Sequence, residues 1–248
     1  AVNTVINNRI ANYVDVGSGK VILILHGWGS SNKVFAEVVQ ELSKTWRVVA
    51  PDFPGFGGSA EPDTAWGVAG YVDWTRQFMA KVGFTPTVIL GHSFGGRVVL
   101  KGVGENILQP EKIILVDSAG IKPRQTATKQ ALAGISKVGK VLFRGQMGEK
   151  IRTSVYRKIG ASDYVNASPL MKEVFKKTVS EDLRKYIPKI KTKSLIIWGE
   201  NDLDTPVTDA QELAKIAGAQ LKIVAGAGHY VFLDKKTEVI KAIKEFLA

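Results

Sequence analysis

The chain has 248 residues, 45% of them hydrophobic, which is enough to bury the core of one α/β domain and excludes a disordered or fibrous protein. It contains no cysteine and three histidines, which excludes disulfides and a cysteine nucleophile and argues against a metal site. The net charge of +11 would suit a polyanion, but no aromatic residues alternate with the basic ones as a nucleic-acid surface requires.

Short apolar runs alternate along the chain with amphipathic stretches of helical length. The apolar runs predict six strands, at residues 21–25, 47–50, 87–90, 112–116, 194–198 and 221–224. Amphipathic segments at 34–44 and 238–247 predict helices. Because the strands are apolar almost throughout, they indicate a mostly parallel sheet that is covered by helices on both faces. The fold class is therefore α/β.

Between the strands at 112–116 and 194–198 lies a basic, helix-prone segment of about 75 residues, too long for one crossover helix. We interpret residues 121–189 as a helical cap inserted into a catalytic core formed by 1–120 and 190–248. Residues 121–193 hold 18 basic and 5 acidic residues, whereas the rest of the chain holds 16 basic and 18 acidic residues. The preferred interpretation of this excess of basic residues is that they lie on the solvated faces of helices, as for Lys172 and Lys176. Attraction for anionic substrates or surfaces is the alternative.

Polar and glycine-rich residues follow the predicted strands. In an open parallel sheet the carboxyl ends of the strands meet at one edge, where binding sites form. The stretches that reach this edge are His26-Gly27-Trp28-Gly29-Ser30, Pro51 to Ser59, Gly91 to Gly96, Gly199 to Asp202, and Ala225 to His229.

Ser93 is the expected nucleophile. It is the central residue of Gly91-His92-Ser93-Phe94-Gly95, a Gly-x-Ser-x-Gly pattern between an apolar strand and a helix-forming segment. Glycines at these positions let the chain turn sharply and expose the serine hydroxyl. The alternative is a turn serine that caps the following helix.

A serine hydroxyl needs a base, and the base needs an orienting carboxylate. His229 is the expected base, because it follows the last strand and is the only histidine after residue 92. Asp202, after the penultimate strand, is the expected carboxylate, with Asp117 and Asp204 as rivals. We expect structural hydrogen bonds from His26 and His92 rather than proton transfer.

The backbone N–H groups of Trp28 and Phe94 are expected to form the oxyanion hole, since they follow the first strand and the nucleophile. Apolar side chains beside the reacting groups, Phe53, Tyr230 and Val231, are expected to form the acyl pocket. Gly17-Ser18-Gly19-Lys20 does not qualify as a phosphate loop, because Val14 and Val21 occupy positions that such a loop gives to Gly and to Ser or Thr.

The motifs HGWGS, DFPGFGGS, GHSFGG, WGENDLDTP and GAGHYVFLD, in this order, resemble those of the α/β-hydrolase superfamily. The resemblance covers residues 1–120 and 190–248. It implies a mostly parallel eight-stranded sheet, an antiparallel start near residues 2–16, a cap over the site and a triad of Ser93, Asp202 and His229. Ser93 separates the chain from dehalogenases and epoxide hydrolases, which carry Asp there.

The expected function is hydrolysis of carboxylic esters through an acyl-enzyme, without metal or cofactor. The expected partner is a small-molecule ester, and whether this ester carries a negative charge is left open. The alternatives are a hydrolase of carbon–carbon bonds or other acyl groups, and a ligand receptor that keeps a slow triad. No apolar run approaches the roughly 18 residues of a membrane span, and no secretory signal is evident, so we expect a soluble, cytoplasmic protein, with a removed leader left open.

Overall fold

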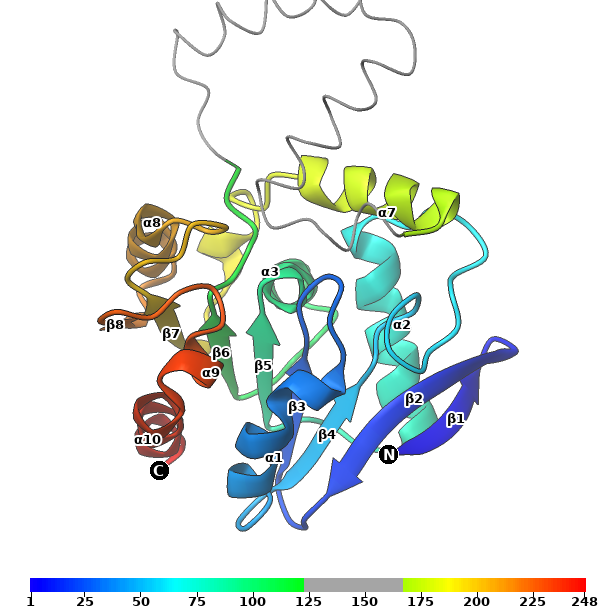
Figure 1. Ribbon diagram of the computed structural model, residues 1–248, viewed down its shortest axis with the longest axis horizontal. Helices are drawn as coiled ribbons and strands as arrows, with labels where there is room; N and C mark the ends of the chain where they lie inside the picture. The colour runs from blue at the N-terminus through cyan, green and yellow to red at the C-terminus, as the bar shows by residue number, and fades with distance from the viewer. Residues whose placement is uncertain (123–166) are drawn as a thin grey trace, which may run out of the picture.

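A single eight-stranded sheet organises the computed structural model, which describes residues 1–122 and 167–248 (Figure 1). The strand order across the sheet is β1-β2-β4-β3-β5-β6-β7-β8. The β1–β2 and β2–β4 pairs are antiparallel, and all other neighbours are parallel. The strands are β1 Val2–Ile6, β2 Arg9–Val16, β3 Val21–Leu25, β4 Arg47–Pro51, β5 Val88–His92, β6 Lys112–Val116, β7 Lys193–Gly199 and β8 Gln220–Val224.

The six strands predicted from apolar runs are confirmed. Strands β3 and β6 match the predicted ranges, and the other four differ by one or two residues at one end or at both ends. All five residues of β3 and of β5 are buried, as expected for strands covered on both faces. The antiparallel hairpin of β1 and β2 agrees with the implied antiparallel start.

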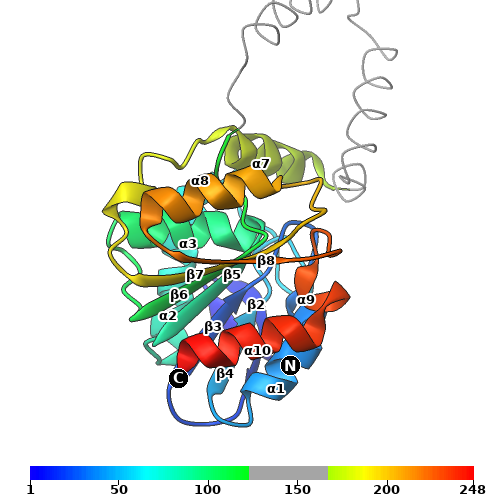
Figure 2. The same cartoon turned by 90° about the vertical axis from the view of Figure 1, so that its left-hand side faces the viewer.

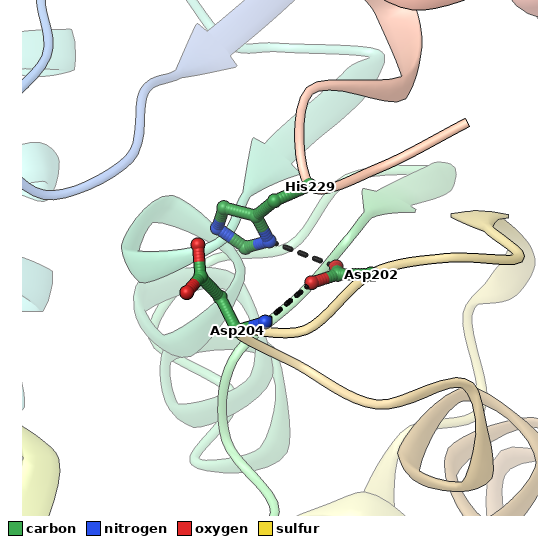
Figure 3. Close-up of side chains that lie close together, drawn as sticks. All are labelled: Asp202, Asp204 and His229. Carbon is green, nitrogen blue, oxygen red and sulfur yellow. Dashed lines mark hydrogen bonds and ion pairs between the residues drawn. The ribbon is translucent and has the colours of Figure 1, made fainter. Parts of the chain in front are cut away.

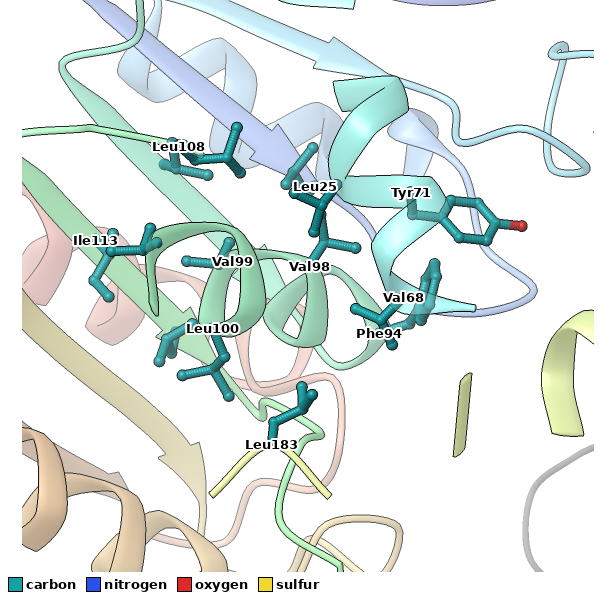
Figure 4. Close-up of a cluster of buried hydrophobic side chains, with 14 of the residues drawn as sticks. Leu25, Val68, Tyr71, Phe94, Val98, Val99, Leu100, Leu108, Ile113 and Leu183 are labelled. Atoms are coloured by element: carbon teal, nitrogen blue, oxygen red, sulfur yellow. The ribbon is translucent and has the colours of Figure 1, made fainter. Parts of the chain in front are cut away.

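Helices cover both faces of the sheet (Figure 2). Helices α2, α3 and α8 lie on one face, and α1 and α10 lie on the other. Each face buries its own apolar cluster, and Figure 4 shows the cluster around α3, which includes Leu25, Val98 and Val99. The helices are η1 Asn32–Phe35, α1 Ala36–Leu42, α2 Val68–Val82, α3 Phe94–Gly104, α7 Pro169–Ser180, η2 Ile187–Lys189, α8 Val207–Ala217, α9 Val231–Asp234 and α10 Lys236–Leu247.

Most of the predicted cap, residues 123–166, lies outside the described residues, so the division of the chain at 121 and 189 stays a prediction. Within the described part of that segment, α7 lies across the edge of the sheet where the parallel strands end (Figure 1). Leu183 and Ile187, which precede β7, are fully buried in the apolar cluster that also contains residues of α3 and α8. Every helix in the described ranges is too short or too polar to cross a bilayer.

Candidate active site

Ser93 stands at a sharp turn between β5 and α3. Its backbone has φ 50° and ψ −111°, a region that residues with a side chain rarely occupy. The turn requires glycine on both sides. A Cβ on Gly91 would lie 2.8 Å from the backbone carbonyl carbon and oxygen of Gly95, and a Cβ on Gly95 would collide with the carbonyl oxygen of Leu25. The local chain therefore holds the Ser93 side chain at the edge of the sheet.

The structure brings the side chains of Ser93, His229 and Asp202 into one hydrogen-bonded chain. His229 Nε2 lies 3.0 Å from Ser93 Oγ, and His229 Nδ1 lies 2.8 Å from Asp202 Oδ2. With Nδ1 protonated and donating to the carboxylate, Nε2 is free to accept the proton of the Ser93 hydroxyl. The three groups come from the ends of β5, β7 and β8, more than 100 residues apart in the case of Ser93 and Asp202.

Asp202 is held rigidly in place. Its Oδ1 accepts the backbone N–H groups of Asp204 and Thr205 at 2.8 and 2.9 Å, and its Oδ2 also accepts the Thr205 hydroxyl at 2.7 Å. Figure 3 shows Asp202 bonded to His229, while the carboxylate of Asp204 lies on the other side of the imidazole ring. This loop carries two carboxylates, Asp202 and Asp204. Among the described hydrogen bonds, only Asp202 bonds to His229.

The electrostatics of the pair favour a protonated imidazole beside an ionised carboxylate. Burial alone would raise the pKa of Asp202, but hydrogen bonds from His229 and Thr205 outweigh it and lower the pKa below its usual range. Burial alone would lower the pKa of His229, but the hydrogen bond to Asp202 and the charges of Asp202, Asp204 and Asp117 raise the pKa. His229 therefore loses its proton at a higher pH than a free histidine does.

The third carboxylate weighed from the sequence, Asp117, braces the loops that carry the other groups. Its Oδ1 accepts the N–H of Gly199 at 2.8 Å, and its Oδ2 accepts the N–H of Val231 at 3.1 Å. These donors lie three residues before Asp202 and two residues after His229. Burial raises the pKa of Asp117 to about 7. Asp117 thus ties the acid-bearing loop to the histidine-bearing loop without bonding to the imidazole.

His26 and His92 make structural hydrogen bonds, as the sequence predicts. His26 Nδ1 donates to the carbonyl of Gly27 at 2.7 Å and its Nε2 accepts the N–H of Phe53 at 2.8 Å, which joins the loops after β3 and β4. His92 Nε2 donates to the backbone carbonyl of His229 at 2.9 Å. Burial lowers the pKa of His26 to about 4 and that of His92 to about 3, so both stay neutral.

The backbone N–H groups of Trp28 and Phe94, which are expected to form the oxyanion hole, donate none of the described hydrogen bonds. Phe94 is the first residue of α3, where backbone N–H groups have no partner within the helix. Trp28 follows Gly27, where a Cβ would lie 2.8 Å from His92 Nδ1 and 3.3 Å from Ser93 Cβ. The glycine lets this loop approach Ser93 closely.

A cavity of about 350 Å³ opens beside Ser93 and His229. Tyr230 lines it, with Trp28, Phe94 and, from α7, Phe175 and Val179. Phe53 and Val231, which the sequence also predicts in the pocket, are fully buried and are absent from the described lining. The Phe53 ring packs behind the cavity against Phe94. The Val231 side chain belongs to the cluster on the other face of the sheet.

Two residues that the sequence reasoning missed complete the site. Thr205 bonds to Asp202, and its place three residues after an aspartate is the signal that could have revealed it. Arg97 lines the cavity although only 7% of it is exposed. A charged residue one helical turn after the nucleophile, directly before the apolar segment Val98-Val99-Leu100, is the signal in that case.

Among the described residues, one group of side chains has metal-ligand chemistry, formed by Asp202, Asp204 and His229, whose ligand atoms lie within 4.8 Å of one another. Both oxygens of Asp202 and Nδ1 of His229 already take part in hydrogen bonds. The arrangement therefore fits a proton-transfer chain better than a set of ligands.

Comparison with known proteins identifies the family. A sequence model described as the alpha/beta hydrolase family matches residues 22–242. The chain is 26% identical over 259 residues to a monoacylglycerol lipase of Xenopus laevis, covering 94% of this chain and 76% of the relative. It is 23% identical over 261 residues to 2-hydroxy-6-oxo-2,4-heptadienoate hydrolase of Pseudomonas putida, covering 96% and 92%. A solved bacterial membrane phospholipase A shares the fold with a TM-score of 0.77 and 21% identity, covering 99% of this chain and 84% of that one. The chain belongs to the alpha/beta hydrolase family.

Proposed function

We propose that the protein is a serine hydrolase that cleaves carboxylic esters through an acyl-enzyme intermediate. The observation that supports this most directly is the continuous hydrogen-bond chain from Ser93 Oγ through the His229 ring to Asp202. Likeness to a monoacylglycerol lipase adds support for an ester substrate.

In the first half of the reaction, His229 Nε2 takes the proton of Ser93 as Oγ bonds to the ester carbonyl carbon. The carbonyl oxygen becomes an anion and accepts hydrogen bonds from the N–H groups of Trp28 and Phe94. When the tetrahedral intermediate collapses, the carbon–oxygen bond to the alcohol breaks. His229 returns its proton to the departing alkoxide, and the acyl group stays on Ser93.

In the second half, water replaces the alcohol. His229 Nε2 takes a proton from the water molecule as its oxygen bonds to the acyl carbon. Collapse of this second intermediate releases the carboxylic acid and returns the proton to Ser93. Asp202 keeps the imidazole in the Nδ1–H tautomer and stabilises its positive charge in both halves.

Turnover of p-nitrophenyl acetate by the Ser93→Ala variant tests this function. We expect kcat to fall by about 10⁶-fold, the size of loss seen when the serine of such a triad is removed. Ser118→Ala is the matched control. Ser118 lies at the same edge of the sheet and donates to the carbonyl of Ala119 instead of contacting His229, so this variant should keep most of its activity. Equal activity of wild type and Ser93→Ala would refute the proposal.

A second candidate is hydrolysis of a carbon–carbon bond in a dienoic ketoacid. Likeness to the Pseudomonas putida hydrolase over 96% of the chain favours it. The same three side chains could serve that reaction. Comparing kcat/KM on short p-nitrophenyl esters with kcat/KM on 2-hydroxy-6-oxo-2,4-dienoates separates the two, because the preferred reaction should show the higher value.

A further inference from the structure

Arg97 is a buried cation in the wall of the cavity that contains Ser93. It lies four residues after Ser93 on α3, so about 6 Å of helix rise separates the two positions. Only 7% of its surface is exposed, and it lines the same cavity as Ser93 and His229. An arginine at this depth needs partners for both its charge and its five N–H donors.

The described hydrogen bonds use one corner of the guanidinium. Nη1 donates to the backbone carbonyls of Thr178 at 3.0 Å and Glu181 at 2.9 Å, at the carboxyl end of α7. Nε and Nη2 make no hydrogen bond with the described residues. Among those residues, the only fully buried side-chain nitrogen or oxygen without a partner is His92 Nδ1. Nε and Nη2 of Arg97 are therefore not fully buried, and among the described cavities Arg97 lines the one that also contains Ser93.

The charge of Arg97 also lacks a carboxylate partner among the described residues. The next cation on α3, Lys101, has such a partner. Lys101 is buried to the same degree, and its Nζ lies 2.7 Å from Glu181 Oε1 and 2.6 Å from the Tyr186 hydroxyl. Arg97 has two neutral carbonyls instead. Burial lowers the pKa of Arg97 to about 10, so the guanidinium is still charged at neutral pH.

The two acidic residues that line the cavity, Asp204 and Asp209, do not compensate this charge. The carboxylates that raise the pKa of Arg97 are Glu181 and Asp182. Glu181 is paired with Lys101, and Asp182 with Arg184. The cavity thus has an acidic part near His229 and a cationic part near α3 and α7.

We propose that Arg97 binds a carboxylate of the substrate through its Nε and Nη2 edge, so that this protein acts on esters that also carry a carboxylate group. The Nε–Nη2 edge of arginine matches the two oxygens of a carboxylate and gives two parallel hydrogen bonds. The reaction in this inference rests on the proposed ester hydrolysis, whereas the binding of a carboxylate can be measured without turnover.

Matched substrate pairs test the inference. We choose mono-p-nitrophenyl esters of glutaric, adipic and suberic acids, and compare each with its ω-amide, which has the same shape without the charge. Wild type should give a higher kcat/KM for the acid than for the amide in at least one pair. Arg97→Gln should reduce that ratio by about tenfold to a hundredfold, the worth of hydrogen bonds to a charged group. Arg97→Lys keeps the charge but cannot form two parallel hydrogen bonds. Its ratio should therefore fall between that of wild type and that of Arg97→Gln.

Lys101→Met controls for the structural role of Arg97. Both side chains hold the segment around Glu181 against α3, so both variants loosen that contact. Only Arg97→Gln should change the ratio of acid to amide, because a loss common to both substrates cancels in the ratio. An equal change of the ratio in the two variants, or no preference for any acid in wild type, would overturn the inference.

Binding separates this inference from the ester-hydrolase proposal. Titration calorimetry with phenylacetate and phenylacetamide should show tighter binding of the carboxylate to wild type, and a loss of that difference in Arg97→Gln. If Ser93→Ala keeps full ester turnover but this difference is present, the reaction is wrong and the carboxylate site stands. If carboxylate and amide bind wild type equally, the carboxylate site is wrong whatever the reaction.

Discussion

Replacing Asp202 by Asn should disable His229 without moving it. Oδ1 of Asp202 accepts two backbone N–H groups, from Asp204 and Thr205, so the amide oxygen of an asparagine would take that place. Its NH2 group would then occupy the place of Oδ2, 2.8 Å from His229 Nδ1. A donor there favours the imidazole tautomer with the proton on Nε2, which cannot accept the proton of Ser93.

We expect kcat for p-nitrophenyl acetate to fall by about 10⁴-fold in Asp202→Asn, as an equivalent change does in a serine protease. That corresponds to about 5 kcal/mol of transition-state stabilisation. The pH dependence should change as well. In wild type, kcat/KM should rise with pH through a pKa above the usual histidine value, because Asp202 raises the pKa of His229.

Asp204→Asn is the matched control for this prediction. The Asp204 side chain is exposed. Asp204 donates a hydrogen bond to Asp202 from its backbone N–H, which the substitution keeps. The activity of the Asp204→Asn variant should stay within about tenfold of wild type. The rise in its kcat/KM should move to lower pH, because one negative charge near His229 is lost. A loss in Asp202→Asn no larger than in Asp204→Asn would refute the assignment of Asp202 as the orienting acid.

Two further predictions concern stability. Gly95→Ala should cost about 1–3 kcal/mol of unfolding free energy in urea, because the added methyl meets the rigid backbone of Leu25 and His26, whereas Gly67→Ala, where a methyl meets open space, should cost less. Equal losses would contradict this. Folding raises the pKa of Asp117 from 3.8 to about 7, so the folded state keeps the carboxyl proton up to a higher pH than the unfolded state does. The unfolding free energy of wild type should therefore fall as pH rises between these values. Asp117→Asn should remove about 2 kcal/mol of the loss between pH 5.5 and 8, and an unchanged pH dependence would contradict it.

Much of the fold could be predicted because its signals are local. Runs such as Val21–Leu25 are apolar on both faces, which defines a buried strand, and the glycines around Ser93 define the turn that follows β5. The order of Ser93, Asp202 and His229 along the chain then places them at neighbouring strand ends. The structure brings these three side chains together as the sequence predicts.

The parts that depend on packing across the chain could not be predicted in this way. Phe53 and Val231 are adjacent to site residues in sequence, but the direction of each side chain is set by the layer in which it packs, and both point into the apolar clusters. The bracing role of Asp117 depends on backbone N–H groups of Gly199 and Val231, which are distant in sequence. Arg97 gains its place in the cavity wall only when α7 lies over α3.

Mass spectrometry of the acid-quenched reaction with p-nitrophenyl butyrate tests the acyl-enzyme most directly. Wild type should gain the mass of one butyryl group, located by digestion on the peptide that contains Ser93, and His229→Ala should accumulate far less of it. A fully active wild-type protein that never carries an acyl group, or carries it on another residue, would contradict attack by Ser93.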